Sequence, residues 1–62
     1  MKQGDYIRNT KTNKIGVVID ANYAGYGILK YYLIGNPSNT HICINPKTRF
    51  VLYNFKEKCD IV

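Results

Sequence analysis

The sequence has little that would support catalysis or a membrane span. Tryptophan is absent, and 62 residues include one histidine and only four acidic residues. No two acids have a spacing that forces them together, and AGYG at residues 24–27 lacks the lysine and serine that follow a phosphate-binding loop. The longest apolar-rich run, residues 26–34, contains Lys30 and is far shorter than the roughly 18 residues of a membrane span. We therefore expect a protein that is not an enzyme, needs no cofactor and does not enter a membrane.

Cysteine is also scarce, and no CxxC pair is present. His41 and Cys43 alternate, so a strand would place both side chains on one face, and Cys59 would be a third potential zinc ligand. Structural zinc sites use four ligands at tighter spacing, so the sequence favours two reduced, buried thiols and no metal. The basic N-terminus is not followed by an apolar run, which predicts a cytoplasmic protein, in a host cytoplasm or a virion if the chain is viral.

The pattern that remains is that of β-strands. Apolar residues alternate with others, or occupy both faces, in residues 15–19, 28–34, 42–44 and 50–53, and no segment keeps a helical spacing for three turns. Ile15, Val17 and Ile19 share one face of their run. A chain of this size buries only roughly 60% of its unfolded surface, so its core is small. We expect one all-β domain over residues 1–62.

Turn residues divide these runs. Residues 9–14 are polar and contain asparagines suited to a tight hairpin, residues 22–27 form a glycine-bearing loop, and residues 35–39 break the chain again. Pro46 after Asn45 predicts a type I turn that pairs residues 42–44 with residues 49–53 as a hairpin. The tail from residue 54 predicts a short 3₁₀ turn before a closing strand. Five short strands that must hide their edges favour a small SH3-like barrel.

The first twenty residues carry a more specific pattern. Gly4-Asp5-x-Ile7-Arg8, followed by Gly16-Val17-Val18, resembles the first half of a KOW-type SH3-like barrel, a kind of small protein often encoded by bacteriophages. Gly4 is expected to allow close approach of the first strand, Asp5 to accept hydrogen bonds from loop amides, and Ile7 to point inward. Gly16 is expected where a side chain would collide with a crossing strand. Barrels of this type bind RNA or protein segments, so the resemblance itself leaves the ligand open.

Aromatic residues indicate a binding surface. The chain has six tyrosines and two phenylalanines. Tyrosine anchors protein interfaces at a low entropic cost, although a strand face with solvated tyrosines has the same pattern. Tyr31 and Tyr32 are adjacent, so one of them must face outward. We predict a non-enzymatic module that acts through protein–protein contacts, as a viral accessory or virion-associated protein. The residues expected to bind the partner are Tyr6, Arg8, Tyr23, Tyr26, Lys30 and Tyr31.

Charge supports an alternative ligand. The formal net charge is +5, and the nine basic residues are scattered without a run, so only the fold can gather them into a patch. The same charge also serves solubility alone. The alternative function is therefore nucleic-acid binding in the KOW manner, through Arg8, Lys11, Lys14, Lys30 and Arg49. A homo-oligomer is compatible with the sequence, because a small barrel gains stability by burying tyrosines against a second copy.

Overall fold

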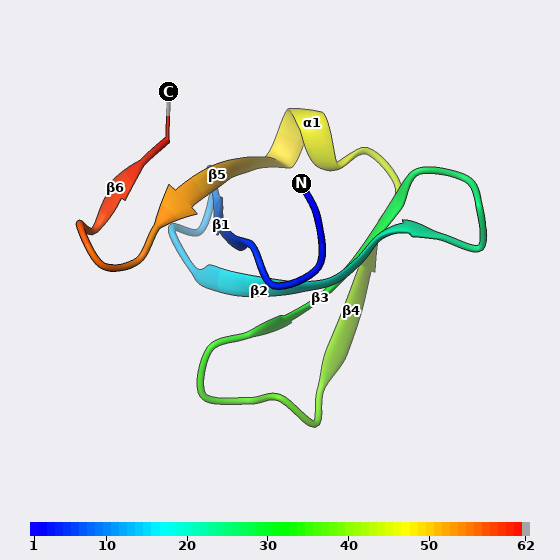
Figure 1. Cartoon of the computed structure of the whole chain (residues 1–62), viewed down its shortest axis with the longest axis horizontal. Helices are drawn as coiled ribbons and strands as arrows, with labels where there is room; N and C mark the ends of the chain where they lie inside the picture. Colours follow the sequence, from blue (N-terminus) through cyan, green and yellow to red (C-terminus); the bar gives the residue numbers. More distant parts are fainter. Residues whose placement is uncertain (62) are drawn as a thin grey trace.

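The chain forms a curved antiparallel sheet of six strands with one short helical turn (Figure 1). The computed structural model describes residues 1–61. In chain order the elements are β1 (Tyr6–Asn9), β2 (Ile15–Tyr23), β3 (Ile28–Leu33), β4 (Thr40–Cys43), α1 (Pro46–Arg49), β5 (Phe50–Asn54) and β6 (Cys59–Asp60). The strand order across the sheet is β4-β3-β2-β1-β5-β6. The predicted all-β class is confirmed, and residues 1–61 form six strands where the sequence pattern predicted five.

Asparagine chemistry forms the β1–β2 hairpin, as predicted. The Asn9 side-chain oxygen accepts hydrogen bonds from the backbone N–H groups of Lys11 and Thr12, at 2.9 and 3.1 Å. Asn13 takes the left-handed backbone conformation, with φ of 61°. Asparagine tolerates this conformation better than most residues. The loop thereby brings β1 and β2 into register, with Ile7 opposite Gly16.

The N-terminal segment is anchored to β2. The backbone N–H of Gly4 donates to the carbonyl of Val18 at 2.9 Å, and the Asp5 carboxylate accepts the N–H of Lys2 at 2.9 Å. The predicted role of Asp5 as an acceptor of backbone hydrogen bonds is thus confirmed. The reason expected for Gly4 is wrong. No heavy atom lies within 4 Å of the position a Cβ would take, and a φ of +89° is what favours glycine there.

The core lies on the concave inner face of the sheet. Its buried side chains are Ile7, Val18, Leu29, Cys43 and Phe50, with exposed fractions between 0 and 8%. Ile7 points inward, as predicted. Gly16 is needed at this face because a Cβ would lie 3.1 Å from the Tyr32 carbonyl oxygen and 3.2 Å from Cδ2 of Tyr31. The core therefore packs directly against the backbone of β2.

The two faces of β2 are both apolar. Val18 belongs to the core, whereas the neighbouring Val17, with Ile15 two residues before it, lies on the outer, convex face. Register shifts between Val18 and Asp20, and again before Tyr23, interrupt the pairing of β2 with β3. Such irregularities increase local twist and help to bend the sheet. The shared face predicted for the isoleucine–valine alternation is therefore the face opposite the core.

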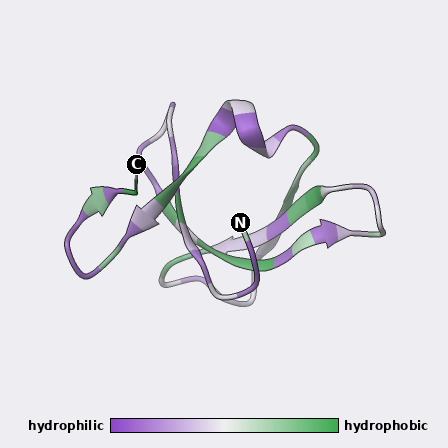
Figure 2. Cartoon of the chain, turned by 45° about the horizontal axis from the view of Figure 1, so that its top comes forward, coloured by the Kyte–Doolittle hydropathy of each residue, from purple (hydrophilic) through white to green (hydrophobic). Residues whose placement is uncertain are grey.

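The predicted hairpin of residues 42–44 with residues 49–53 is wrong. β4 pairs with β3, and β5 pairs with β1 on the other side of the sheet. Between them the chain makes the helical turn α1, which begins with Pro46 and appears mostly purple in Figure 2. Proline has a φ suited to the first turn of a helix, and it lacks the N–H that would be unpaired there. The turn carries the chain across the open end of the sheet instead of reversing it beside β4.

The tail also differs from the prediction. The single helical turn precedes β5, and residues 55–58 form a hairpin turn between β5 and β6 in place of the expected 3₁₀ turn. The Asn54 side chain accepts the N–H of Glu57 at 3.2 Å, and Lys58 has a φ of 54°. These two features reverse the chain tightly, so the last strand pairs with β5.

Candidate protein-binding surface

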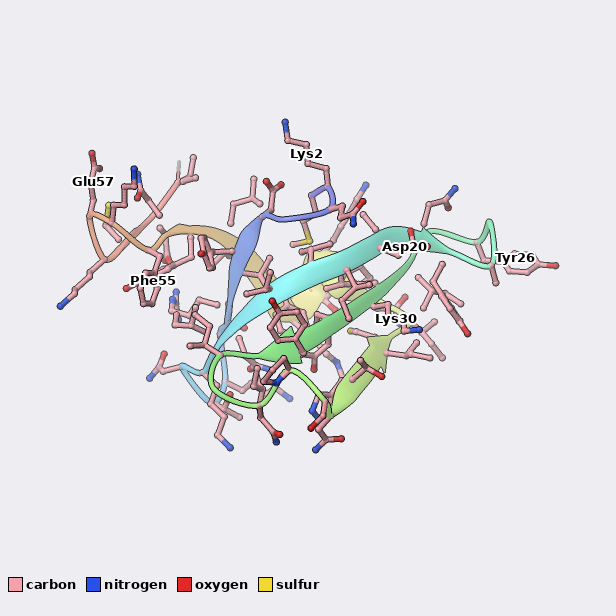
Figure 3. The ribbon with its side chains drawn as sticks, turned by 60° about the horizontal axis from the view of Figure 1, so that its bottom comes forward. Lys2, Asp20, Tyr26, Lys30, Phe55 and Glu57 are labelled. Atoms are coloured by element: carbon pink, nitrogen blue, oxygen red, sulfur yellow. The ribbon has the colours of Figure 1, made fainter. Side chains whose placement is uncertain are left out.

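The structure separates the predicted partner-binding residues into three places. Tyr6 and Arg8 lie on the outer face of β1. Tyr23 and Lys30 meet near the far end of the β2–β3 hairpin, where the Lys30 ammonium lies 5.0 Å from the centre of the Tyr23 ring. Tyr26 is at the tip of that hairpin and is 81% exposed; Figure 3 shows it pointing away from the body of the molecule. These residues do not form one contiguous site.

Tyr31 belongs to the inner face. Its ring packs edge-on against Phe50, with centroids 4.8 Å apart, and stacks on His41 at 5.4 Å. Burial raises the pKa of its hydroxyl above the usual value of 10.0. The adjacent Tyr32 takes the outer face, as the alternation requires. The place expected for Tyr31 on a binding surface is therefore held by Tyr32.

Arg8 is engaged within the molecule. Its guanidinium donates two hydrogen bonds to the Asp60 carboxylate, at 2.9 and 2.7 Å, and a third to the Asn13 side-chain oxygen at 2.9 Å. These bonds raise the pKa of Arg8 and lower that of Asp60. Because a carboxylate already neutralises it, Arg8 is a poor contributor to a phosphate-binding patch. It ties β1 to the C-terminal strand instead.

The other predicted nucleic-acid-binding residues lie at two ends of the sheet. Lys11 and Lys14 are in the β1–β2 loop, and the backbone N–H of Thr10 in this loop donates to the Arg49 carbonyl at 2.9 Å. Lys30 lies near the start of β3, opposite Asp20 of β2 and toward the other end of the sheet. Three of the five residues thus come from neighbouring segments, and Lys30 does not join them.

An apolar surface that the sequence pattern did not indicate covers the outer face. Strand register places Tyr6, Val17 and Tyr32 in one row across β1, β2 and β3. Side chains directly opposite in antiparallel strands share a face, with Cβ atoms about 5 Å apart. The Ile34 N–H donates to the Ile15 carbonyl at 3.1 Å, which sets these two isoleucines side by side next to the row. We call the set, completed by Phe55, the outer apolar face: Tyr6, Ile15, Val17, Tyr32, Ile34 and Phe55.

Phe55 completes this surface from the β5–β6 turn. Its ring stacks on Tyr6, with centroids 5.3 Å apart and planes inclined by 28°. A hollow of about 470 Å³ lies between Phe55 and the isoleucines Ile15 and Ile34, and a second of about 340 Å³ lies on the side of Phe55 that faces Tyr53. Phe55 is 43% exposed and stands between the two hollows. The surface therefore has both a projecting aromatic ring and concave places beside it.

The local sequence offered only a weak signal for this face. Ile15 and Val17 alternate as residues of a core face do, and Phe55 lies in a segment with no strand pattern. Phe55 reaches Tyr6 through the β5–β6 hairpin and the pairing of β5 with β1, both of which are long-range features. The surface becomes visible only once these pairings are known.

The histidine and cysteine residues do not form a metal site. His41 and Cys43 lie on β4, and Cys59 lies on β6 at the opposite edge of the sheet. Over residues 1–61 no group of three or more His, Cys, Asp or Glu side chains is placed to hold a metal ion. Both thiols are free; Cys43 is buried as expected, whereas the expectation of burial is wrong for Cys59. The cause is the position of Cys59 on a two-residue edge strand.

Comparison with known proteins identifies no family for the chain. No family model matches it, and neither a curated protein nor a solved structure matches it significantly. Among the described residues no helix is long and apolar enough to cross a membrane. The resemblance to KOW-type barrels therefore remains a prediction from residues 4–18.

Proposed function

We propose that the chain is a non-enzymatic protein-binding module and that the outer apolar face is the surface that meets the partner. One observation carries the proposal: six aromatic and aliphatic side chains gather on the face of the sheet opposite the core. Tyr6, Ile34 and Phe55 are 39, 42 and 43% exposed there. Contiguous exposed apolar surface on a small soluble domain is typical of an interaction site.

The composition of the face favours a protein partner. Tyrosine and phenylalanine bury large areas and are enriched at the centres of protein interfaces, where charged residues are depleted. The Tyr6–Phe55 stack holds both rings in place before binding, which reduces the entropy lost on association. The charged Arg8 and Asp60 beside Tyr6 neutralise each other, and Lys14 and Lys56 stand at the edges of the hollows on either side of Phe55.

The proposal includes the finer fold expected from the sequence, an SH3-like barrel. Two features support it: β5 returns to pair with β1, and the helical turn α1 directly precedes β5. In this interpretation β1 to β5 are the five strands of the barrel, α1 takes the place of the helical turn expected in the tail, and β6 extends β5 as a hairpin. A bacteriophage origin, with a place in the host cytoplasm or the virion, is part of the same proposal and is supported by the N-terminal motif alone.

Site-specific photocrosslinking in the source cells tests this function. A photoreactive phenylalanine analogue at Tyr32 or Phe55 should yield a discrete crosslinked protein. The same analogue at Thr12, an exposed residue of the β1–β2 loop, is the matched control and should yield none. The proposal is wrong if the outer positions give no discrete product, or if Thr12 gives the same product in equal yield.

Nucleic-acid binding is the second candidate, because the loop that carries Lys11 and Lys14 is hydrogen-bonded through Thr10 to the backbone of Arg49. Titration with single- and double-stranded oligonucleotides at two salt concentrations tests it. Binding through these cations should weaken steeply with salt, and the Lys11→Gln, Lys14→Gln double variant should reduce the salt slope by about two. Affinity no better than about millimolar at low salt would exclude this candidate.

A further inference from the structure

The two edges of the sheet are protected very differently. β6 has two residues, and its Asp60 is fixed by Arg8. Within residues 1–61, β4 at the other edge pairs only with β3, so alternate backbone N–H and C=O groups along it face away from the sheet. Proteins commonly protect edge strands with lysine, proline or a bulge. The sequence Thr-His-Ile-Cys of β4 has neither residue, and its pairing with β3 is regular.

A hollow accompanies this open edge. It has a volume of about 340 Å³, and β4 with the residue after it supplies one wall through Ile42, Cys43 and Ile44. Phe50 and Arg49 line the other wall, across the gap that separates β4 from β5. Ile42 is 54% and Ile44 74% exposed, so the edge offers apolar side chains as well as backbone groups. A strand added to β4 would place alternate side chains into this hollow.

The charge of the segment that contains the edge is positive. Residues 21–56 contain no Asp or Glu, and all four acidic residues lie outside this segment. The segment forms β3, β4, α1 and β5, and carries Lys30, Lys47, Arg49 and Lys56. Lys30 on β3 lies between Ile42 of β4 and Asp20 of β2, and Arg49, which lines the hollow, has no acidic residue opposite it in the strand pairing of residues 1–61. A second copy of the chain would bring the same acid-free, positively charged edge, so its charge opposes pairing of β4 with β4.

We propose that β4 binds an extended acidic segment of another protein as an additional strand. The backbone of that segment pairs with the free groups of Thr40–Cys43. An apolar side chain enters the hollow against Phe50, and an acidic side chain binds the Arg49 guanidinium. Because the edge is distinct from the outer apolar face, the two proposals fail independently. The added strand would extend the row of Tyr32 and Thr40, so one partner can span both surfaces.

Nuclear magnetic resonance titration of the isotopically labelled protein with two synthetic hexapeptides tests the inference. One alternates valine with glutamate, and its matched control alternates valine with lysine. We expect the glutamate peptide to shift the backbone amide signals of residues 40–44 and Arg49, with a dissociation constant of about 1 mM or tighter. The lysine peptide should leave these signals in place.

Two charge-reversal variants distinguish a specific contact with Arg49 from attraction of the acidic peptide by the net positive charge of the protein. Arg49→Glu and Lys56→Glu change the net charge equally, but only Arg49 lines the hollow. Arg49→Glu should weaken binding of the glutamate peptide by roughly tenfold, and Lys56→Glu by less than about twofold. Ile42→Glu, which places a charge of the same sign as the peptide on the edge, should also abolish binding.

Three results would overturn the proposal. The first is signal changes confined to the outer apolar face, and the second is equal loss of affinity in the two charge reversals. The third is a dimer of the protein alone that Ile42→Lys dissociates, because it would mean that a second copy occupies the edge. Val17→Ser, a change in the outer apolar face, should leave affinity for the glutamate peptide unchanged, so failure of the proposed function is distinguishable from failure of this inference.

Discussion

The two faces of the sheet carry similar side chains but differ in burial. On the inner face the five core side chains are at most 8% exposed, whereas Tyr6, Ile34 and Phe55 on the outer face are each about two-fifths exposed. Burial of apolar surface during folding removes it from water and stabilises the fold. Apolar surface that stays exposed can still be removed from water when a partner binds, and this favours association. The inner face therefore holds the sheet together, and the outer face keeps apolar side chains exposed at the surface that we propose for binding.

The largest effect should come from emptying the inner face. Leu29→Ala removes a side chain that is 1% exposed and should cost about 2–5 kcal/mol of unfolding free energy. A domain of this size rarely has more than about 3–5 kcal/mol in total, so the variant should be largely unfolded at 25 °C by circular dichroism. Ile34→Ala on the outer face is the matched control. A control that unfolds equally would remove the distinction between the faces.

Overfilling the inner face should have the next largest effect. Gly16→Ala places a Cβ 3.1 Å from the Tyr32 carbonyl oxygen, a backbone atom that cannot move without shifting β3. We expect a loss of about 1–3 kcal/mol in urea denaturation. Unchanged stability would show that β3 yields at this point and that the inner face is packed less tightly than described.

Within the outer face a smaller energy should be measurable. The stacked Tyr6 and Phe55 rings should be coupled by about 0.5 kcal/mol in a double-mutant cycle of alanine substitutions. Partial exposure keeps this value at the low end for aromatic pairs. A coupling above about 2 kcal/mol would mean that the outer face contributes to the fold as the core does.

The smallest effect concerns the ion pair between Arg8 and Asp60. Because Arg8 holds the pKa of Asp60 below its usual value of 3.8, this pair stabilises the fold above the unfolded-state pKa. That contribution is lost as pH falls through the lower folded-state pKa. Asp60→Asn should therefore lower Tm slightly at pH 7 and have no effect of this kind below both pKa values. Glu57→Gln is the control for charge, and an equal fall in its Tm at pH 7 would contradict a specific contact.

Local chemistry made part of the fold predictable from the sequence. The asparagines of residues 9–14 indicated the first hairpin, and the alternation around Ile7 indicated the side of β1 that faces the core. Both features depend on residues close together in the chain. By contrast, β5 pairs with β1, from which it is separated by most of the chain, and no local pattern distinguishes this pairing from one with the nearby β4.

The candidate site was less predictable for the same reason. Arg8 and Tyr31 had the right chemistry for a surface, but Asp60 neutralises one and Phe50 packs against the other, both from distant parts of the chain. Phe55 joins the outer apolar face through a stack with Tyr6 that no local pattern indicates. In β2 the apolar character of both faces left the direction of Val17 and Val18 undecided.

These two valines provide the most direct measurement of the difference between the faces. Val17→Ala and Val18→Ala remove the same atoms from adjacent positions of one strand, on opposite faces. Urea denaturation should show a loss of about 2 kcal/mol for Val18→Ala and of less than about 1 kcal/mol for Val17→Ala. Equal losses, or a larger loss at Val17, would contradict the account, because the outer face would then be needed for the fold and not left free for a partner.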